Sequence, residues 1–310
     1  MSIVTNTFNW QGVWPTMITP FHEDKTIDYN SLEKLIEWYI AHGVAGLFAV
    51  CQSSEMFALS LEERVQLAAF VVKHTAGRVP VIASGHISDT LEGQLEEIGE
   101  ISKTGIDAFV LVSNRLASSN ESDEVWIANL QKILHAFPAI RFGLYECPYP
   151  YKRLLSQHML KFCAESGQIL FLKDTCCDDK LLQQRLRLVQ NTTLRLFNAN
   201  STTLLSSLEQ GAAGYSGVMA NIHPDLYVWL VENDHSNGKK AQQLQYYLTL
   251  SSLVEHLAYP ISAKYYLQKM GVIRSITTRT KDEHELNAHM KLVIDQLALS
   301  DNSVRQESFL

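Results

Sequence analysis

The stretch Ile169-Leu170-Phe171-Leu172-Lys173-Asp174-Thr175 is an apolar run that ends in charged and polar residues. Apolar runs without alternation are typical of strands buried on both faces, as in parallel sheets. Similar runs, rich in β-branched residues, recur roughly every 25–35 residues along the chain. They lie at 12–18, 46–50, 79–83, 108–112, 141–145, 194–197 and 214–219. With the run at 169–173, the sequence therefore predicts eight buried strands.

The segments between these runs have helical spacing. Apolar residues within 31–40 form a single stripe, and Asp28 offers a start signal for this helix. Ser60 and Glu63 have the spacing of a capping box at the start of the next helix. Glycines stand where helices should end, at Gly43, Gly77, Gly105 and Gly167. Strands and helices thus alternate along the chain.

This alternation predicts the fold class and the domain organisation. Eight strands with intervening helices favour a (β/α)8 TIM barrel over residues 1–223. A doubly wound sheet is the competing α/β architecture, but no glycine-rich nucleotide-binding motif follows the first run. Residues 224–300 have helical patterns only, and we expect them to pack on the barrel as a C-terminal helical extension. Residues 301–310 are expected to form a loose tail.

Composition narrows the possible partners and the compartment. The chain has 310 residues and a formal net charge of −7, which argues against nucleic-acid binding. No apolar run is long enough to span a membrane, and the first residues do not resemble a signal peptide. The five cysteines are odd in number and show no C-x-x-C pair. We therefore expect a cytoplasmic protein with reduced thiols.

Lys173 and Tyr145 are the candidate catalytic residues, because reactive side chains in such a barrel lie at the carboxyl ends of the strands. A buried lysine is easily deprotonated, and a neutral amine can attack a carbonyl to form a Schiff base. The alternative is a lysine that ends its strand and reaches solvent. A phenol on the neighbouring strand could shuttle protons. The alternative is a core tyrosine with a satisfied hydroxyl.

The ends of the other strands carry further polar candidates. The turn Gln52-Ser53-Ser54 offers hydroxyl and N–H groups that suit a carboxylate, although serine also favours turns for local reasons. His86 could bind substrate or carry a proton, but a structural histidine is the more common case. Glu146 could be a second acid or base, but an ion pair is the more common role, and we interpret it as an ion-pair partner. No cluster of histidine, cysteine and carboxylate residues has metal-ligand spacing, so we predict no metal.

Several motifs together resemble one known family. They are Thr19-Pro20-Phe21, the segments 28–32 and 43–46, Ser54-Glu55 with 59–64, the entry 77–83, Leu144-Tyr145-Glu146-Cys147-Pro148, Leu172-Lys173-Asp174, and 211–214 with Ala220-Asn221 and Pro224. In order and spacing, over about residues 10–275, the chain resembles the dihydrodipicolinate synthase / N-acetylneuraminate lyase family of pyruvate-handling class I aldolases.

The resemblance implies a role for each matching residue. Lys173 would form an imine with pyruvate or another 2-oxo acid and no other cofactor, and Tyr145 would be the proton shuttle. Ser53 would act with its neighbours Gln52 and Ser54 to hold the substrate carboxylate. The remaining candidate substrate-binding residues are Thr175, Asn198, Asn200, Arg115 and His86. The family also implies a homotetramer or a homodimer.

The chain departs from the family pattern at two positions that concern catalysis. The tyrosine that crosses the subunit interface in the family's proton relay is Leu116 here, and the arginine five residues after the motif tyrosine is Pro150. Our main hypothesis is a lyase, or aldolase, acting on a hydroxylated 2-oxo acid of the sugar-acid type. The alternatives are dihydrodipicolinate synthesis itself, against which Leu116 and Pro150 speak, and a 2-oxo-acid-binding protein that has lost turnover.

Overall fold

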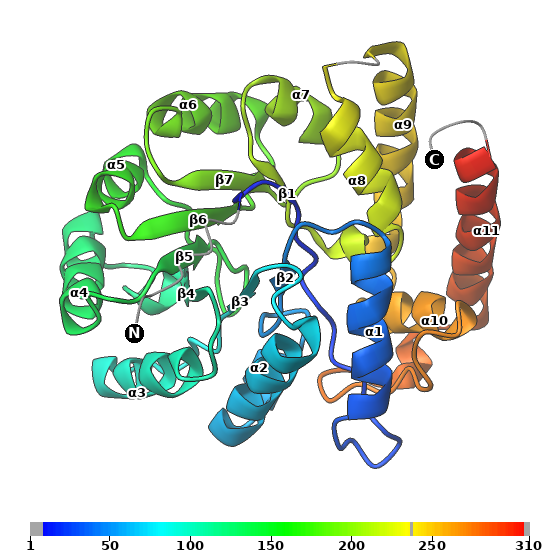
Figure 1. Cartoon of the computed structure of the whole chain (residues 1–310), viewed down its shortest axis with the longest axis horizontal. Helices are drawn as coiled ribbons and strands as arrows, with labels where there is room; N and C mark the ends of the chain where they lie inside the picture. The colour runs from blue at the N-terminus through cyan, green and yellow to red at the C-terminus, as the bar shows by residue number, and fades with distance from the viewer. Residues whose placement is uncertain (1–8, 236–237, 307–310) are drawn as a thin grey trace.

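The computed structural model describes residues 9–235 and 238–306, and Figure 1 shows their arrangement. The strands of this part of the chain are β1 (Gly12–Val13), β2 (Leu47–Phe48), β3 (Val81–Ala83), β4 (Ala108–Val112), β5 (Phe142–Tyr145), β6 (Ile169–Asp174), β7 (Arg195–Asn198) and β8 (Gly214–Tyr215). They form one sheet in the order β1-β8-β7-β6-β5-β4-β3-β2, and neighbouring strands are parallel. Backbone hydrogen bonds from Met17 N to Phe48 O and from Phe48 N to Pro15 O join its two ends. The predicted (β/α)8 barrel is therefore confirmed.

The helices lie outside the barrel, as Figure 1 shows. Those that alternate with the strands are α1 (Tyr29–Ala41), α2 (Leu61–Thr75), α3 (Leu91–Ser102), α4 (Asp123–Ala136), α5 (Gln157–Ser166), α6 (Asp179–Val189), α7 (Leu204–Glu209) and α8 (Pro224–Asn233). Asp28 caps α1 through the Ser31 N–H, and Ser60 and Glu63 form the predicted capping box of α2. Gly43 and Gly167 follow helices with φ of 78° and 69°. Local sequence signals therefore fix where these helices begin and end.

Several strands are shorter than the sequence predicted, and the difference is largest for the first and the last. The first run, 12–18, contributes only the two residues of β1, and beyond them Thr16 pairs with Phe48 as an isolated bridge. The last run, 214–219, leaves the sheet after Tyr215, and a 3-10 turn spans Val218–Asn221. The apolar runs at both ends of the barrel therefore extend beyond the strands that they predict.

Aromatic rings fill the barrel interior one layer beneath the end of β6. The ring centroids of Phe171 and Phe197 are 4.6 Å apart, and Trp14 lies 5.8 Å from Phe171. Phe48 lies 6.2 Å from both Phe171 and Tyr145, and these aromatic side chains are buried. These rings fill the barrel interior. The polar side chains at the carboxyl ends of the strands therefore lie above a packed aromatic core.

The C-terminal segment packs beside α8 and adds a second apolar core. It comprises α9 (Gly238–Ser251), the 3-10 turn η4 (Ser252–His256), α10 (Ile261–Lys269), the 3-10 turn η5 (Glu283–Glu285) and α11 (Ala288–Val304). Figure 1 shows α9, α10 and α11 grouped on one side of the barrel. The predicted helical extension is confirmed. Among the described residues, none of these helices has the length and apolar character needed to cross a membrane.

The expectation of a loose tail from residue 301 is wrong for the first residues of that segment. Helix α11 continues to Val304, and the Asp301 side chain is fully buried. Its carboxylate accepts hydrogen bonds from the hydroxyls of Tyr247 and Tyr266, both at 2.7 Å, and pairs with His223 at 2.8 Å. These polar partners hold the end of the helix in place. Apolar periodicity in the sequence does not reveal such polar contacts. Residues 307–310 lie outside the described part of the chain.

Candidate active site

Lys173 and Tyr145 meet at the mouth of the barrel, as their positions at strand ends predicted. The two residues are register partners on β6 and β5, so their side chains point to the same side of the sheet. The Lys173 Nζ lies 4.6 Å from the centroid of the Tyr145 ring, and each residue is 4% exposed. The geometry therefore excludes the alternative in which this lysine reaches bulk solvent.

The electrostatic environment of Lys173 favours a neutral amine. Burial lowers the pKa of Lys173 from 10.5 to about 8, although the nearby Cys51, Cys147 and Glu255 act in the opposite direction. About one molecule in ten then carries a neutral amine at pH 7, compared with fewer than one in a thousand for an ordinary lysine. This deprotonated fraction is the species that attacks a carbonyl carbon.

The Tyr145 hydroxyl is arranged as a proton donor. It donates a hydrogen bond to the Gln52 Oε1 at 3.0 Å, and the Cys147 thiol donates to the same oxygen at 3.3 Å. Burial, with the neighbouring thiols of Cys147 and Cys51, raises the pKa of Tyr145 well above 10. The phenol therefore stays protonated at neutral pH and can give a proton or a hydrogen bond to a substrate oxygen.

The turn that was expected to hold a carboxylate has two faces. Gln52 and Ser53 line the cavity in front of Lys173. The Ser54 hydroxyl instead donates to the Cys51 carbonyl and accepts from the Cys51 N–H, both at 2.7 Å, which closes the turn from inside. Ser54 is fully buried, so of the three residues only Gln52 and Ser53 present side chains to a ligand.

The cavity has a volume of about 790 Å³ and draws its walls from both the barrel and the C-terminal segment. Predicted site residues in its lining are Gln52, Ser53, Tyr145, Lys173, Thr175 and Asn200. Lys152 also lines it, and its ammonium donates to the Thr175 carbonyl oxygen. Hydroxyl, amide and ammonium groups thus stand around the reactive amine.

Besides Ser54, three predicted substrate-binding residues do not belong to this lining. His86 is fully buried, accepts a hydrogen bond from the Val112 N–H at 3.0 Å, and has a pKa lowered to about 4, chiefly by burial. The Asn198 amide donates to the hydroxyls of Thr203 and Ser207 at 2.9 and 3.0 Å. These two side chains turn into the wall, where the Val112 N–H is a partner of His86 and two hydroxyls are partners of Asn198.

The third, Arg115, pairs with Asp89 and lies 5.6 Å above the ring of Phe57. Its guanidinium is therefore engaged outside the cavity lining.

The C-terminal segment supplies lining residues that the sequence did not reveal. Glu255 and His256 come from η4, and Tyr259 follows shortly after. The Tyr259 hydroxyl accepts from the Asn221 amide at 3.1 Å, which ties it to the turn after β8. No motif marks these residues, because their position depends on how the helical segment docks on the barrel.

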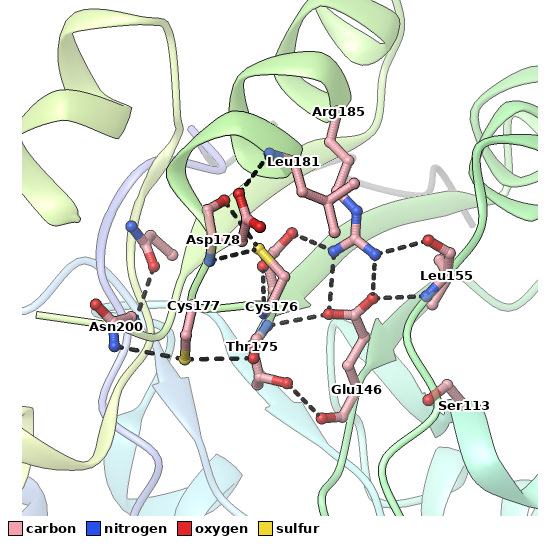
Figure 2. Close-up of polar contacts among 12 residues, drawn as sticks. Ser113, Glu146, Leu155, Thr175, Cys176, Cys177, Asp178, Leu181, Arg185 and Asn200 are labelled. Carbon is pink, nitrogen blue, oxygen red and sulfur yellow. Dashed lines mark hydrogen bonds and ion pairs between the residues drawn. The ribbon is translucent and has the colours of Figure 1, made fainter. Parts of the chain in front are cut away.

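A buried ion cluster supports the ends of β5 and β6 behind the cavity. As Figure 2 shows, the Arg185 guanidinium contacts Glu146, at 2.8 Å. It also contacts Asp174, at 2.5 Å. Glu146 also accepts from the N–H groups of Leu155 and Thr175, at 2.7 and 3.0 Å. The ion-pair interpretation of Glu146 is confirmed, and the cluster holds the backbone just after Lys173 and the segment that follows β5.

Comparisons with known proteins agree with this geometry. The family model described as "Dihydrodipicolinate synthetase family" matches residues 9–293. A protein from Psychrobacter arcticus named 4-hydroxy-tetrahydrodipicolinate synthase is 27% identical, with 85% of this chain and 86% of that protein covered. One of the same name from Pseudoalteromonas atlantica is 28% identical, with coverages of 86% and 90%.

A solved structure is similar in fold. A prophage protein of the dihydrodipicolinic acid synthase family from E. coli K12, solved in complex with pyruvate, superposes with a TM-score of 0.85 at 21% identity. The superposition covers 94% of this chain and 98% of that one. At this identity the likeness concerns the fold alone.

Proposed function

Because the chain belongs to the dihydrodipicolinate synthetase family of class I aldolases, we propose that Lys173 is its imine-forming lysine and that pyruvate, or a 2-oxo acid built on pyruvate, is its substrate. The observation that carries the proposal is the buried Lys173 amine, with its pKa lowered to about 8, beside the Tyr145 ring. The covalent imine supplies the electron sink, so the reaction needs no metal or other cofactor.

Each residue of the site has a defined task in this chemistry. The neutral Lys173 amine attacks the ketone carbon, and Tyr145 protonates the carbinolamine hydroxyl so that it leaves as water. Ser53 and the N–H groups of its turn hold the carboxylate, next to Gln52, which positions the Tyr145 hydroxyl. The resulting iminium then accepts electrons when a carbon–carbon bond breaks, and the reverse reaction forms that bond.

The second reactant, we propose, is hydroxylated and resembles the carbon chain of a sugar acid. Thr175, Asn200 and Glu255 supply hydrogen-bonding groups along the cavity wall. Such groups match a chain of alcohols.

Dihydrodipicolinate synthesis is the second candidate, and the names of the curated relatives favour it. Against it stand the buried Leu116, which has no hydroxyl to relay a proton, and Pro150, which offers no side-chain charge. We further propose a cytoplasmic location and assembly as a homotetramer or a homodimer.

One experiment separates these functions. Borohydride is added to the protein with pyruvate, and the modified residue is located by mass spectrometry; a reduced adduct at Lys173 is expected, and Lys173→Ala should show none. Hydroxylated 2-oxo acids are then tested for pyruvate release, and pyruvate with aspartate semialdehyde is tested for synthase activity. No adduct with any short 2-oxo acid would overturn the imine mechanism. An adduct without turnover of any substrate would favour a binding protein.

A further inference from the structure

Tyr259 lines the cavity in front of Lys173 but has no task in the chemistry proposed above. It comes from the C-terminal segment, between η4 and α10, and its ring packs against both the barrel core and the second apolar core. These apolar contacts hold the ring at the junction between the barrel and the helical segment. The hydroxyl at the end of the ring therefore has a defined place in the cavity wall.

The buried amide of Asn221 holds this hydroxyl. The Asn221 Nδ2 donates to the Thr16 and Val218 carbonyl oxygens, both at 2.9 Å. The same nitrogen donates to the Tyr259 hydroxyl oxygen at 3.1 Å. Because carbonyl oxygens only accept hydrogen bonds, these contacts fix which side of the amide carries the hydrogens. Asn221 is therefore the donor in its contact with Tyr259.

The phenolic proton of Tyr259 is left for a ligand. An amide nitrogen does not accept hydrogen bonds, so this proton cannot point back at Asn221. Within residues 9–235 and 238–306, no carbonyl or carboxylate oxygen accepts it. Burial raises the pKa of Tyr259, although the nearby Ser53 hydroxyl acts in the opposite direction, so the phenol is protonated at neutral pH. The hydroxyl is thus an oriented donor without a protein acceptor of this kind.

The contacts of Asn221 also place this donor close to the turn that holds the carboxylate in our proposal. Thr16, which shares the Asn221 amide with Tyr259, accepts a hydrogen bond on its hydroxyl from the Ser53 hydroxyl at 3.3 Å. Ser53 and Tyr259 also line the same cavity. A carboxylate has two oxygens with about four acceptor positions, so it can accept from both hydroxyls and from backbone N–H groups at once.

We propose that Tyr259 is a further substrate-binding residue, whose hydroxyl donates a hydrogen bond to the carboxylate of the 2-oxo acid. The inference rests on the proposed function, because it concerns the substrate of that same site. Hydrogen bonds to an ionised acceptor are roughly twice as strong as those to a neutral one. Tyr259 therefore favours 2-oxo acids over neutral ketones, and Asn221 is the positioning residue that holds its hydroxyl.

Tyr259→Phe tests this role with pyruvate alone, so the second reactant need not be known. Full-length protein is trapped with cyanoborohydride over a range of pyruvate concentrations, and the adduct at Lys173 is measured by mass spectrometry. The substitution keeps the ring and removes the donor, so the half-saturating pyruvate concentration should rise about 10-fold or more. The trapping rate at saturation should change less than about 2-fold, which also shows that the variant is folded. Tyr246→Phe, an exposed tyrosine of α9, is the matched control.

Methyl pyruvate separates a contact with the carboxylate from a general disturbance of the site, because the ester carries no charge. Below saturation, Tyr259→Phe should lower the trapping rate about 10-fold with the acid and less than about 2-fold with the ester. Equal losses with acid and ester would overturn the proposed contact. A wild-type half-saturating concentration of pyruvate in Tyr259→Phe would overturn it as well. Absence of the Lys173 adduct in wild-type protein with pyruvate would instead remove the imine mechanism on which the inference rests.

Discussion

The Lys173 ammonium lies 4.6 Å from the centre of the Tyr145 ring, and the two residues are register partners on β6 and β5. A cation over an aromatic ring is stabilised by about 0.5–2 kcal/mol, which alone would raise the pKa of the lysine. The depression from 10.5 to about 8 corresponds to roughly 3 kcal/mol in the opposite direction. Burial therefore outweighs the ring contact, and the folded barrel destabilises the charged form of Lys173, the proposed nucleophile.

This balance predicts the pH dependence of imine formation. Only the neutral amine attacks, so the initial rate of adduct trapping with pyruvate should rise about tenfold per pH unit below pH 8 and level off above it. The measurement is the yield of reduced adduct after short incubations across this range. A rate that continues to rise to pH 10 would mean that the amine titrates like an exposed lysine, which would contradict the effect of burial.

Tyr145→Phe tests the donor role of the phenol. The substitution keeps the ring above Lys173 but removes the hydroxyl that donates to Gln52. Loss of a positioned proton donor typically costs 10²–10⁴-fold, so we expect adduct formation to slow by about 100-fold, with little change in its final extent. Tyr246→Phe, an exposed tyrosine on α9, is the control. Wild-type trapping rates in Tyr145→Phe would assign the protonation of the carbinolamine to another group.

The pairing of Tyr145 and Lys173 could be predicted from sequence, because parallel strands bring their carboxyl ends to one rim. The orientation of other strand-end side chains could not. Ser54 and Asn198 lie at such ends, yet their polar atoms are satisfied by neighbours inside the wall. A strand end places the backbone, whereas local hydrogen bonds decide which way a short polar side chain turns. Glu255 was not predicted, for a different reason. It reaches the cavity only because the C-terminal helical segment docks on the barrel.

The buried ion cluster behind the site predicts a large effect on stability. Arg185 contacts both Glu146 and Asp174, and all three side chains are buried. Arg185→Ala leaves two buried carboxylates without their cation, and we expect a loss of about 3–5 kcal/mol in the free energy of unfolding. Urea denaturation measures this loss. Arg187→Ala, an exposed position on the same helix, should change stability by less than about 0.5 kcal/mol. Equal midpoints for the two variants would contradict the importance of the cluster.

Truncation tests the role that the structure gives to the end of α11. Removing residues 301–310 deletes Asp301, which accepts from Tyr247 and Tyr266 and pairs with the buried His223. It also deletes Arg305, which forms two hydrogen bonds with Asp225 at 2.5 and 2.9 Å. Four buried or half-buried polar groups then lose their partners, and we expect a loss of about 3 kcal/mol or more in urea denaturation. Removing only residues 307–310 is the control, because it leaves both Asp301 and Arg305 in place. Equal stability of the two truncated chains would mean that these contacts do not hold the C-terminal helix to the body of the protein.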